Sequence, residues 1–460
     1  MQRREFTAAV ASVVAGNILP WPTRLLDARP RPSLSQLTWQ RDELALFLHF
    51  GVNTFTDREW GDGREDPAIF DPAGFDARQW ARAARAAGAR ALILTAKHHD
   101  GFCLWPSRVT THSVARTPWR GGAGDAVREF TDACKQEGLR AGLYLSPWDR
   151  NASVYGDSLR YNDFYCDQLT ELLTRYGPIA EVWFDGANGE GPNGRRQVYD
   201  WPRVFGLVRR LQPQAVMFSD AGPDVRWCGN EAGVAGDPNW STMDPAAVPY
   251  PGAPGDAVIA ALQHGDPQGS VWRPAEVDVS IRPGWFHHPA EDERVKTVDQ
   301  LTDIWFTSVG RNSKLLLNVP PTRDGLLHTT DVARLTGLRA QVTSLFAEDL
   351  ARNRRVRWRA AGPSSAVAEV DLGRTVSAGV VRLEEDIVQG QRVARYAVHG
   401  SADGAWQELT RGTTVGHRKL DRFAPTSVRM VRVVVEGVVR PTPLRIGVYG
   451  GRPSAARSPA

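Results

Sequence analysis

The sequence predicts an α/β fold, a (β/α)8-like barrel followed by a C-terminal β-sandwich domain. Between about Leu37 and Leu350, short apolar runs alternate with amphipathic stretches of helical length, which is the pattern of βα units around parallel strands. Polar side chains directly follow several of the apolar runs, as they do at the catalytic face of a β/α barrel. After Asp349 the pattern changes to short alternating strands separated by turns, which is typical of a β-sandwich.

The length and composition of the chain indicate a two-domain globular protein. At 460 residues it is too long for one ordinary core. We divide it into an export segment and leader (1–30), a catalytic barrel (31–350), a β-sandwich domain (351–451) and a disordered tail (452–460). The net charge of +4 is small and the basic residues are scattered, so no nucleic-acid partner is expected. The 16 tryptophans favour a sugar ligand, because indole faces stack on apolar ligand surfaces.

The N-terminus has the features of an export signal. Arg3 and Arg4 precede Phe6 and a short apolar run over 7–19, which points to the twin-arginine route. The alternative is a disordered basic tail. The apolar run is too short to span a bilayer, and no other segment is long enough. We therefore expect a periplasmic or secreted protein with no membrane span.

The barrel strands are predicted from apolar runs that end in polar residues. The first runs precede His49, then Lys97-His98-His99-Asp100, then Ser146, then Asp185. Because the carboxyl ends of parallel strands meet at one face of a barrel, these residues should lie together. The expected strands are 44–48, 91–96, 143–145, 181–184, 215–219 and 314–318.

The helices between these strands are bounded by capping residues. Asp76 is an N-cap candidate and Gly88 a stop signal, and Gly138 ends the next helix in the same way. The expected helices are 76–88, 125–137, 158–176, 202–211 and 295–309. No GxGxxG turn follows the first strand, so a barrel is favoured over an open doubly wound sheet. The stretch 249–289 is rich in Pro and Gly, so the late strands should be short or irregular.

The C-terminal part begins with a basic connector, which we interpret as a solvated linker. It holds five arginines between Arg352 and Arg359. Strands are expected over 366–372, 379–383, 396–400 and 428–435. The domain either binds carbohydrate or braces the barrel. The four cysteines have no close metal-ligand spacing, and no disulfide is predicted between Cys103, Cys134, Cys166 and Cys228.

Three carboxylates are candidates for catalysis. Asp185 ends a strand, Glu231 lies in a loop with glycines on both sides, and Glu276 follows Pro274-Ala275. Glycoside hydrolysis needs two carboxyl groups, and on a barrel these come from different strand ends. Asp185 is therefore paired with Glu231 or Glu276. The competing interpretation of each carboxylate is a salt bridge on a loop.

The histidines at two strand ends allow two interpretations. His49, His98, His99 and Asp100 could ligate a metal ion, but adjacent residues at a strand end tend to point in different directions. Imidazoles also suit sugar hydroxyls, because each ring can donate and accept. We favour sugar binding and expect neither a metal nor a cofactor.

An ordered set of motifs resembles the retaining α-L-fucosidases of glycoside hydrolase family 29. The motifs are His49-Phe50-Gly51, Glu59-Trp60, 97–102, 144–148, Trp183-Phe184-Asp185-Gly186 and 312–318. The segments 227–231 and 274–286 resemble the branch that prefers α-1,3/1,4-linked fucose. The resemblance covers the chain from about Leu37 to the C-terminal domain, and it implies a β/α barrel followed by a β-sandwich.

The resemblance also implies roles for individual residues. Asp185 would be the nucleophile and Glu231 the acid/base, with Glu276 as the alternative. Trp285 would contact the C6 methyl group of fucose, and Arg226 is a weaker substrate-binding candidate. The other residues expected to line the fucose pocket are His49, Glu59, Trp60, His98, His99 and Tyr144.

The function that follows is removal of terminal α-1,3/1,4-linked L-fucose from an oligosaccharide or glycoconjugate by double displacement. Retention requires the two carboxyl groups to lie about 5–5.5 Å apart. The alternatives are another retaining exo-glycosidase on the same barrel, such as one acting on a galactoside, and a fucose-binding protein without turnover.

Overall fold

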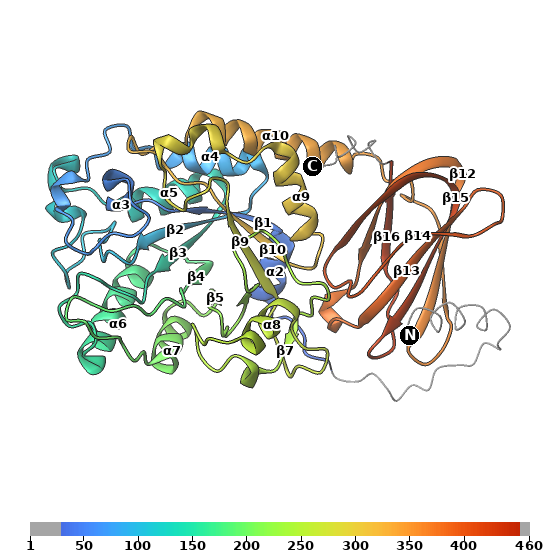
Figure 1. Cartoon of the computed structure of the whole chain (residues 1–460), viewed down its shortest axis with the longest axis horizontal. Coiled ribbons are helices and arrows are strands. Elements are labelled where there is room, and N and C mark those ends of the chain that lie inside the picture. The colour runs from blue at the N-terminus through green and yellow to red at the C-terminus, as the bar shows by residue number, and fades with distance from the viewer. Residues whose placement is uncertain (1–28, 451–460) are drawn as a thin grey trace.

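The computed structural model describes residues 29–450. The expected export segment lies, except for Arg29 and Pro30, outside the described residues, and so does the expected tail over 452–460. A barrel and a C-terminal sheet domain stand side by side, with α10 running along the barrel toward the sheet (Figure 1).

The barrel consists of eight parallel strands in the order β5-β4-β3-β2-β1-β10-β9-β6. A bridge between Phe218 and Val225 links the two end strands and nearly closes the ring. The fold predicted from the sequence is therefore confirmed. The strands are β1 (Leu44–Leu48), β2 (Ala91–Lys97), β3 (Arg140–Leu145), β4 (Glu181–Trp183), β5 (Val216–Phe218), β6 (Arg226–Trp227), β9 (Ala275–Ser280) and β10 (Lys314–Asn318).

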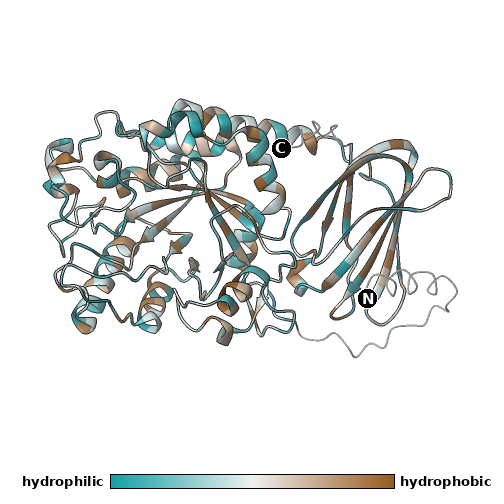
Figure 2. Ribbon diagram, in the orientation of Figure 1, coloured by the Kyte–Doolittle hydropathy of each residue, from teal (hydrophilic) through white to brown (hydrophobic). Residues whose placement is uncertain are grey.

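Helices surround the strands, and their residues are of mixed polarity where the strands are mostly apolar (Figure 2). They are α2 (Leu34–Asp42), α3 (Val52–Thr56), α4 (Ala77–Ala87), α5 (Ala126–Glu137), α6 (Ser158–Arg175), α7 (Trp201–Leu211), α8 (Asp256–His264), α9 (Val298–Thr307) and α10 (Thr329–Leu345). A small hairpin pairs β7 (Thr242–Met243) with β8 (Val271–Trp272). Short 3-10 helices are η2 (Pro67–Ile69), η3 (Val114–Arg116), η4 (Trp119–Gly122), η5 (Pro245–Ala247), η6 (Pro289–Arg294) and η7 (Ile387–Gln389).

The helices α4 and α5 begin and end at the capping residues identified in the sequence. The Asp76 side chain accepts from the backbone N–H groups of Arg78 and Gln79 at the start of α4. Gly88 ends the helix at φ +87°, a conformation that favours glycine. Asp125 and Gly138 bound α5 in the same way. The predicted helices over 125–137, 158–176 and 202–211 are confirmed to within a residue or two.

Alternation along the strands divides the barrel core into two parts. Leu44, Leu46 and Leu48 of β1 pack with the helices in the large outer cluster. Ala45 and Phe47 face the interior, in a separate cluster. This follows from successive side chains pointing to opposite faces of a strand. The inward-facing side chains are the ones that can line a site at the end of the barrel.

The C-terminal sheet is antiparallel and is built on two long strands, β12 and β15. Both ends of β12 contribute to one apolar core, through Ala366 and Ala368 and through Val381 and Leu383. The strands are β11 (Val356–Ala360), β12 (Ser365–Glu384), β13 (Val393–Ser401), β14 (Gln407–Gly412), β15 (Lys419–Gly437) and β16 (Arg445–Tyr449).

Two predictions for this domain need correction. The strands expected over 366–372 and 379–383 belong to the single strand β12, whose register with β15 shifts after Asp371. Gly373, with φ +82°, absorbs the irregularity. Part of the basic connector is not a linker, because 356–360 pairs with β12 as an edge strand. Charged side chains on an edge strand discourage pairing with other chains.

The two parts are joined by polar contacts. Glu43 lies at the start of the barrel. Its carboxylate is 2.6 Å from the guanidinium of Arg418 and 3.1 Å from the ring of His417, two residues of the sheet domain. The Asn312 side chain donates to Ser241 Oγ and to Gln391 Oε1. Within residues 29–450, no helix combines the length and apolar character needed to cross a membrane. All four cysteines are free and buried.

Candidate functional site

A cavity of about 190 Å³ opens at the carboxyl end of the barrel strands. Its walls come from six different strand ends and the loops that follow them, the arrangement expected for a barrel enzyme. It brings together most of the residues predicted from the sequence. The lining residues are Phe47, His49, Glu59, Trp60, His98, His99, Tyr144, Trp183, Asp185, Ala187, Glu231, Asp278 and Trp285.

Asp185 lies two residues beyond the end of β4 and is partly exposed to the cavity. Its Oδ1 accepts the backbone N–H of Ala187 at 2.7 Å. The Tyr144 hydroxyl donates to Oδ2 at 3.0 Å, and His99 Nε2 lies 3.8 Å from the same oxygen. The two hydrogen bonds, from Ala187 and Tyr144, fix the direction of the carboxylate.

Glu231 lies in the loop between β6 and β7 and lines the same cavity. The residue as a whole is exposed, yet partial burial of its carboxyl group raises its pKa. A hydrogen bond with Trp285 acts in the opposite direction, and the nearby charges of Asp185 and Glu59 raise the pKa further. Like charges favour the protonated acid. Glu231 is thus disposed to hold a proton.

The three histidines form a continuous surface inside the cavity. The rings of His98 and His99 lie 4.1 Å apart, and that of His49 lies 5.5 Å from His98. The expectation that adjacent histidines point apart was wrong, because β2 ends at Lys97 and both rings follow outside the strand, where side chains need not alternate. Burial lowers the pKa of His49 to about 3 and that of His98 well below its usual value. Burial also lowers the pKa of His99, against the charge of Asp185.

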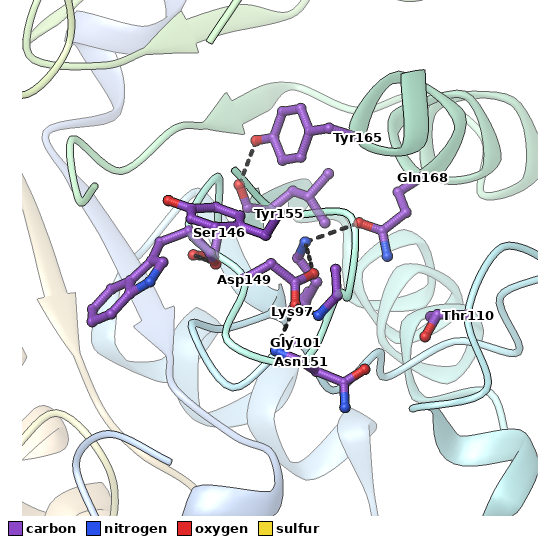
Figure 3. Close-up of polar contacts among 12 residues, drawn as sticks. Lys97, Gly101, Thr110, Ser146, Asp149, Asn151, Tyr155, Tyr165 and Gln168 are labelled. Carbon is purple, nitrogen blue, oxygen red and sulfur yellow. Dashed lines mark hydrogen bonds and ion pairs between the residues drawn. The ribbon is translucent and has the colours of Figure 1, made fainter. Parts of the chain in front are cut away.

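Lys97, the residue before His98 and His99, forms a buried ion pair with Asp149 (Figure 3). Lys97 Nζ lies 2.9 Å from Asp149 Oδ2 and donates to Gln168 Oε1 at 2.9 Å. Asp149 Oδ1 in turn accepts the backbone N–H groups of Asn151 and Ala152. The loops after β2 and β3 are thereby locked together.

The opposite wall is formed by the loop after β9. Both oxygens of Glu59 are occupied there, accepting the backbone N–H groups of Trp285 and Phe286. His288 Nε2 also lies 2.7 Å from Glu59 Oε1. Glu59 therefore lines the cavity mainly by holding Trp285 in place, whose ring packs 5.1 Å from that of His49. Trp60, 60% exposed, stands at the rim against Trp148.

Glu276 does not belong to this cavity, so its proposed place at the site was wrong. Its side chain is fully buried deeper in the barrel, 3.2 Å from Lys314 Nζ. Trp183 Nε1 donates to it at 3.0 Å, and Glu181 shares the same lysine at 2.7 Å. A carboxylate closed in by these partners has no access to a sugar.

Arg226 also lies away from the cavity. It is fully buried and donates to the backbone oxygen of Leu262 and to Asn239 Oδ1, at 2.8 and 2.9 Å. It ties β6 to α8 and the loops behind it, because a buried guanidinium needs several acceptors. Its assignment to substrate binding is corrected accordingly.

Asp278 is a cavity residue that the sequence reasoning missed. It is 3% exposed, and Trp227 Nε1 donates to its Oδ1 at 2.8 Å. Burial raises its pKa well above the usual value, and the charge of Glu231 raises it further. The signal was present in the strand period, since residues 276, 278 and 280 of one strand share a face.

A larger cavity, of about 700 Å³, lies at the opposite end of the barrel. Trp39 and Glu181 line it, but neither Asp185 nor Glu231 does. Size alone therefore does not locate the site. In residues 29–450, no group of three or more His, Cys, Asp and Glu side chains is placed to hold a metal ion.

The cavity combines carboxylates, neutral imidazoles and aromatic walls at the carboxyl end of an eight-stranded barrel. This combination is that of the barrel glycoside hydrolases. Comparison with known proteins makes this specific. The model of the family described as alpha-L-fucosidase matches residues 65–342. The alpha-L-fucosidase 1 of Arabidopsis thaliana is 44% identical over 447 residues, covering 91% of this chain and 86% of that protein.

Solved structures agree in fold as well as in sequence. A glycoside hydrolase 29 family member from an unknown rumen bacterium is 39% identical, with a TM-score of 0.86 over 94% of this chain and 79% of that one. A GH29 fucosidase of Ruminococcus gnavus in complex with fucose is 31% identical, with a TM-score of 0.82 over 95% and 97% of the two chains. The chain belongs to the α-L-fucosidases of glycoside hydrolase family 29.

Proposed function

We propose that the protein removes terminal α-1,3/1,4-linked L-fucose from glycans by a retaining double displacement. Asp185 is the nucleophile and Glu231 the acid/base in this proposal. The observation that carries it is that these two carboxylates, 46 positions apart in the numbering, line one sugar-sized cavity with the three histidines. Two such groups are what retaining hydrolysis uses.

The environments of the two carboxylates suit these different roles. Asp185 accepts hydrogen bonds from Tyr144 and from a backbone N–H, which orient its carboxylate for attack. The raised pKa of Glu231 favours a proton for the departing oxygen. Asp185 attacks the anomeric carbon as Glu231 protonates the leaving group, and Glu231 then takes a proton from the water that releases fucose.

The remaining cavity residues would hold the sugar. His49, His98, His99 and Tyr144 offer hydrogen-bonding groups to its hydroxyls. Trp285 offers an apolar wall to the C6 methyl group, a feature most hexoses lack. The similar Ruminococcus gnavus enzyme, solved in complex with fucose, supports fucose as the sugar here.

The linkage preference would be set outside the fucose cavity. Trp60 projects at the rim beside Trp148, where a branched acceptor sugar can stack on it. Hydrolysis rates on Lewis-type trisaccharides, α-1,2-fucosyl glycans and aryl fucosides test this. The proposal expects the Lewis-type substrates to be faster than the α-1,2-linked ones, and the reverse order would overturn the linkage assignment.

The nucleophile is tested by Asp185→Asn. We expect a fall in kcat/KM of roughly a thousandfold or more, equal to about 4 kcal/mol of activation free energy, with an unchanged melting temperature. Exposed Glu190 provides the matched control Glu190→Gln, which should remain active. Near-wild-type turnover of Asp185→Asn would remove Asp185 from the role.

Two alternatives have distinct outcomes. An aryl-galactoside hydrolysed faster than the aryl-fucoside would indicate another exo-glycosidase on this barrel. Fucose binding without hydrolysis by the native protein would indicate a binding protein. The α-L-fucosidase family membership favours the first proposal over both.

We also propose export by the twin-arginine route to the periplasm or beyond. The support is the sequence Arg3-Arg4 before Phe6 and the apolar run over 7–19. Replacing both arginines with lysine should retain the protein in the cytoplasm. Unchanged export of this variant would contradict the proposal.

A further inference from the structure

The three cavity histidines are held by different neighbours, and these neighbours determine where each ring carries its proton. A neutral imidazole has one donor and one acceptor nitrogen, and the partner of one nitrogen selects the role of the other. Burial keeps all three rings neutral, because it lowers the pKa of each.

His99 is oriented by Ser146. The Ser146 hydroxyl lies 2.7 Å from His99 Nδ1 and donates to the backbone oxygen of Trp148, also at 2.7 Å. A carbonyl oxygen only accepts, so the single hydroxyl proton goes to it. The Tyr144 hydroxyl, which also contacts Ser146, gives its own proton to Asp185. Ser146 Oγ must therefore accept from a protonated His99 Nδ1.

His49 is oriented by Asn318. The Asn318 amide nitrogen donates to the backbone oxygen of Trp285 at 2.8 Å and to Ser280 Oγ at 2.9 Å. This contact with a carbonyl fixes which end of the amide is nitrogen. The atom 2.8 Å from His49 Nδ1 is thus the amide oxygen. It can only accept, so His49 also carries its proton on Nδ1.

His98 has the opposite arrangement. Its Nδ1 is buried and has no hydrogen-bond partner among residues 29–450. A buried N–H without an acceptor is rarer in proteins than an under-satisfied acceptor. The proton is therefore favoured on Nε2, the other ring nitrogen.

We infer that the cavity presents an alternating set of hydrogen-bonding groups, with unprotonated Nε2 acceptors on His49 and His99 and an Nε2–H donor on His98. Ser146 and Asn318 are positioning residues that set this pattern. Resting on the proposed function, the pattern selects a sugar with at least two hydroxyls that donate to His49 and His99, and one that accepts from His98.

Backbone hydrogen bonds and a buried ion pair hold Ser146 in place relative to the His99 ring. The backbone N–H of Ser146 donates to the oxygen of Lys97 at 3.0 Å, and that of Arg150 to the oxygen of His99 at 2.9 Å. Together with the buried Lys97–Asp149 ion pair, these bonds prevent Ser146 from moving independently of the ring. The tautomer is thereby fixed before a ligand arrives.

The test is nitrogen-15 NMR of the full chain labelled at histidine, at neutral pH, because a protonated ring nitrogen resonates far from an unprotonated one. Single His→Gln variants assign the three rings. We expect protonated Nδ1 in His49 and His99 and protonated Nε2 in His98. A protonated Nε2 in His49 or His99, or a protonated Nδ1 in His98, would overturn the inference.

The variant Ser146→Ala sharpens the test. It should convert the His99 signals to an averaged mixture of tautomers and leave those of His49 unchanged. Ser308→Ala is the matched control, because Ser308 is equally buried and its hydroxyl donates only to a helix carbonyl. Unchanged His99 signals in Ser146→Ala would contradict the role of Ser146. If that variant does not fold, the wild-type spectrum still decides the tautomers.

Adding L-fucose to the labelled wild-type protein separates this inference from the proposed function. Fucose should shift the Nε2 signals of His49 and His99 without protonating them. The expected tautomers with no response to fucose would count against fucose as the ligand, and the tautomer assignment would stand. A response to fucose with different tautomers would overturn only the assignment.

Discussion

Acidic side chains lie at both ends of the barrel interior, the amino-terminal end and the carboxyl end where the candidate site opens, and their surroundings differ. At the amino-terminal end, Glu181 and Glu276 share Lys314 and accept from the indole N–H groups of Trp39 and Trp183. At the open end, Asp185 and Glu231 have no Lys or Arg partner within the part of the chain that the structure describes.

This difference shows what makes an inward carboxylate available for chemistry. A buried carboxylate must be paired or lose its charge, and at the amino-terminal end the lysine and tryptophans satisfy that requirement. At the open end the carboxylates are satisfied by weaker partners, so a substrate can compete for them. An inward-facing position on a strand is thus not sufficient to make a carboxylate available for chemistry. Its depth along the strand decides whether it is paired or open to a substrate.

The variant Lys314→Met removes the cation shared by Glu181 and Glu276 at the amino-terminal end. It leaves two buried carboxyl groups without their cation, and removing one partner of a buried ion pair costs about 3–5 kcal/mol. Urea denaturation should show this loss in the free energy of unfolding. Exposed Lys135 supplies the control Lys135→Met, which should change stability by less than about 0.5 kcal/mol. Equal effects of the two substitutions would contradict the contrast between the ends.

The variants Glu231→Gln and Glu276→Gln compare one carboxylate from each end. Glu231→Gln should lower kcat/KM on a fucosylated glycan by about 10²–10⁴, the usual contribution of a general acid/base. Glu276→Gln should keep near-wild-type kinetics and lose about 1–3 kcal/mol of stability, because a buried hydrogen-bonding partner is removed. Initial rates give kcat/KM for the two variants, and thermal melts give their stabilities. Azide rescue of Glu276→Ala rather than Glu231→Ala would transfer the acid/base role.

The variant Glu59→Gln tests the charges around Glu231. Activity requires protonated Glu231 in the first step, so kcat/KM should fall as pH rises through its pKa. Burial and the charges of Asp185 and Glu59 raise that pKa. Removing the Glu59 charge should lower it, so the alkaline limb of the pH profile should move to lower pH. Glu190→Gln should leave the limb in place, and an upward shift for Glu59→Gln would contradict this account.

Much of the fold was predictable because its signals are local. Asp76 and Gly88 define α4, and the run Leu44–Leu48 defines β1. The strand β6 has only two residues, too few to show a period, and α2, α8 and α10 were not predicted. The long strand β12 was divided in two because the irregularity near Gly373 resembles a turn in the sequence.

The candidate site was predictable where strand ends carry polar residues, as at His49, His98 and Asp185. The distance of an inward side chain from the cavity was not predictable. Glu276 and Asp278 occupy the same face of β9, and only the folded barrel shows which one reaches the cavity. Arg226 was a substrate-binding candidate through the family resemblance, but its acceptors come from residues distant in sequence. Partners formed by tertiary contacts leave no pattern in the sequence.

The most direct test of the central claim is mass spectrometry of Glu231→Ala quenched during reaction with an aryl fucoside. An activated leaving group needs no acid, so the first step proceeds while the second lacks its base. We predict that the peptide containing Asp185 gains the mass of one fucosyl group, and that azide removes it. A fucosyl group on another residue, or wild-type turnover with no adduct, would contradict the pairing of Asp185 with Glu231.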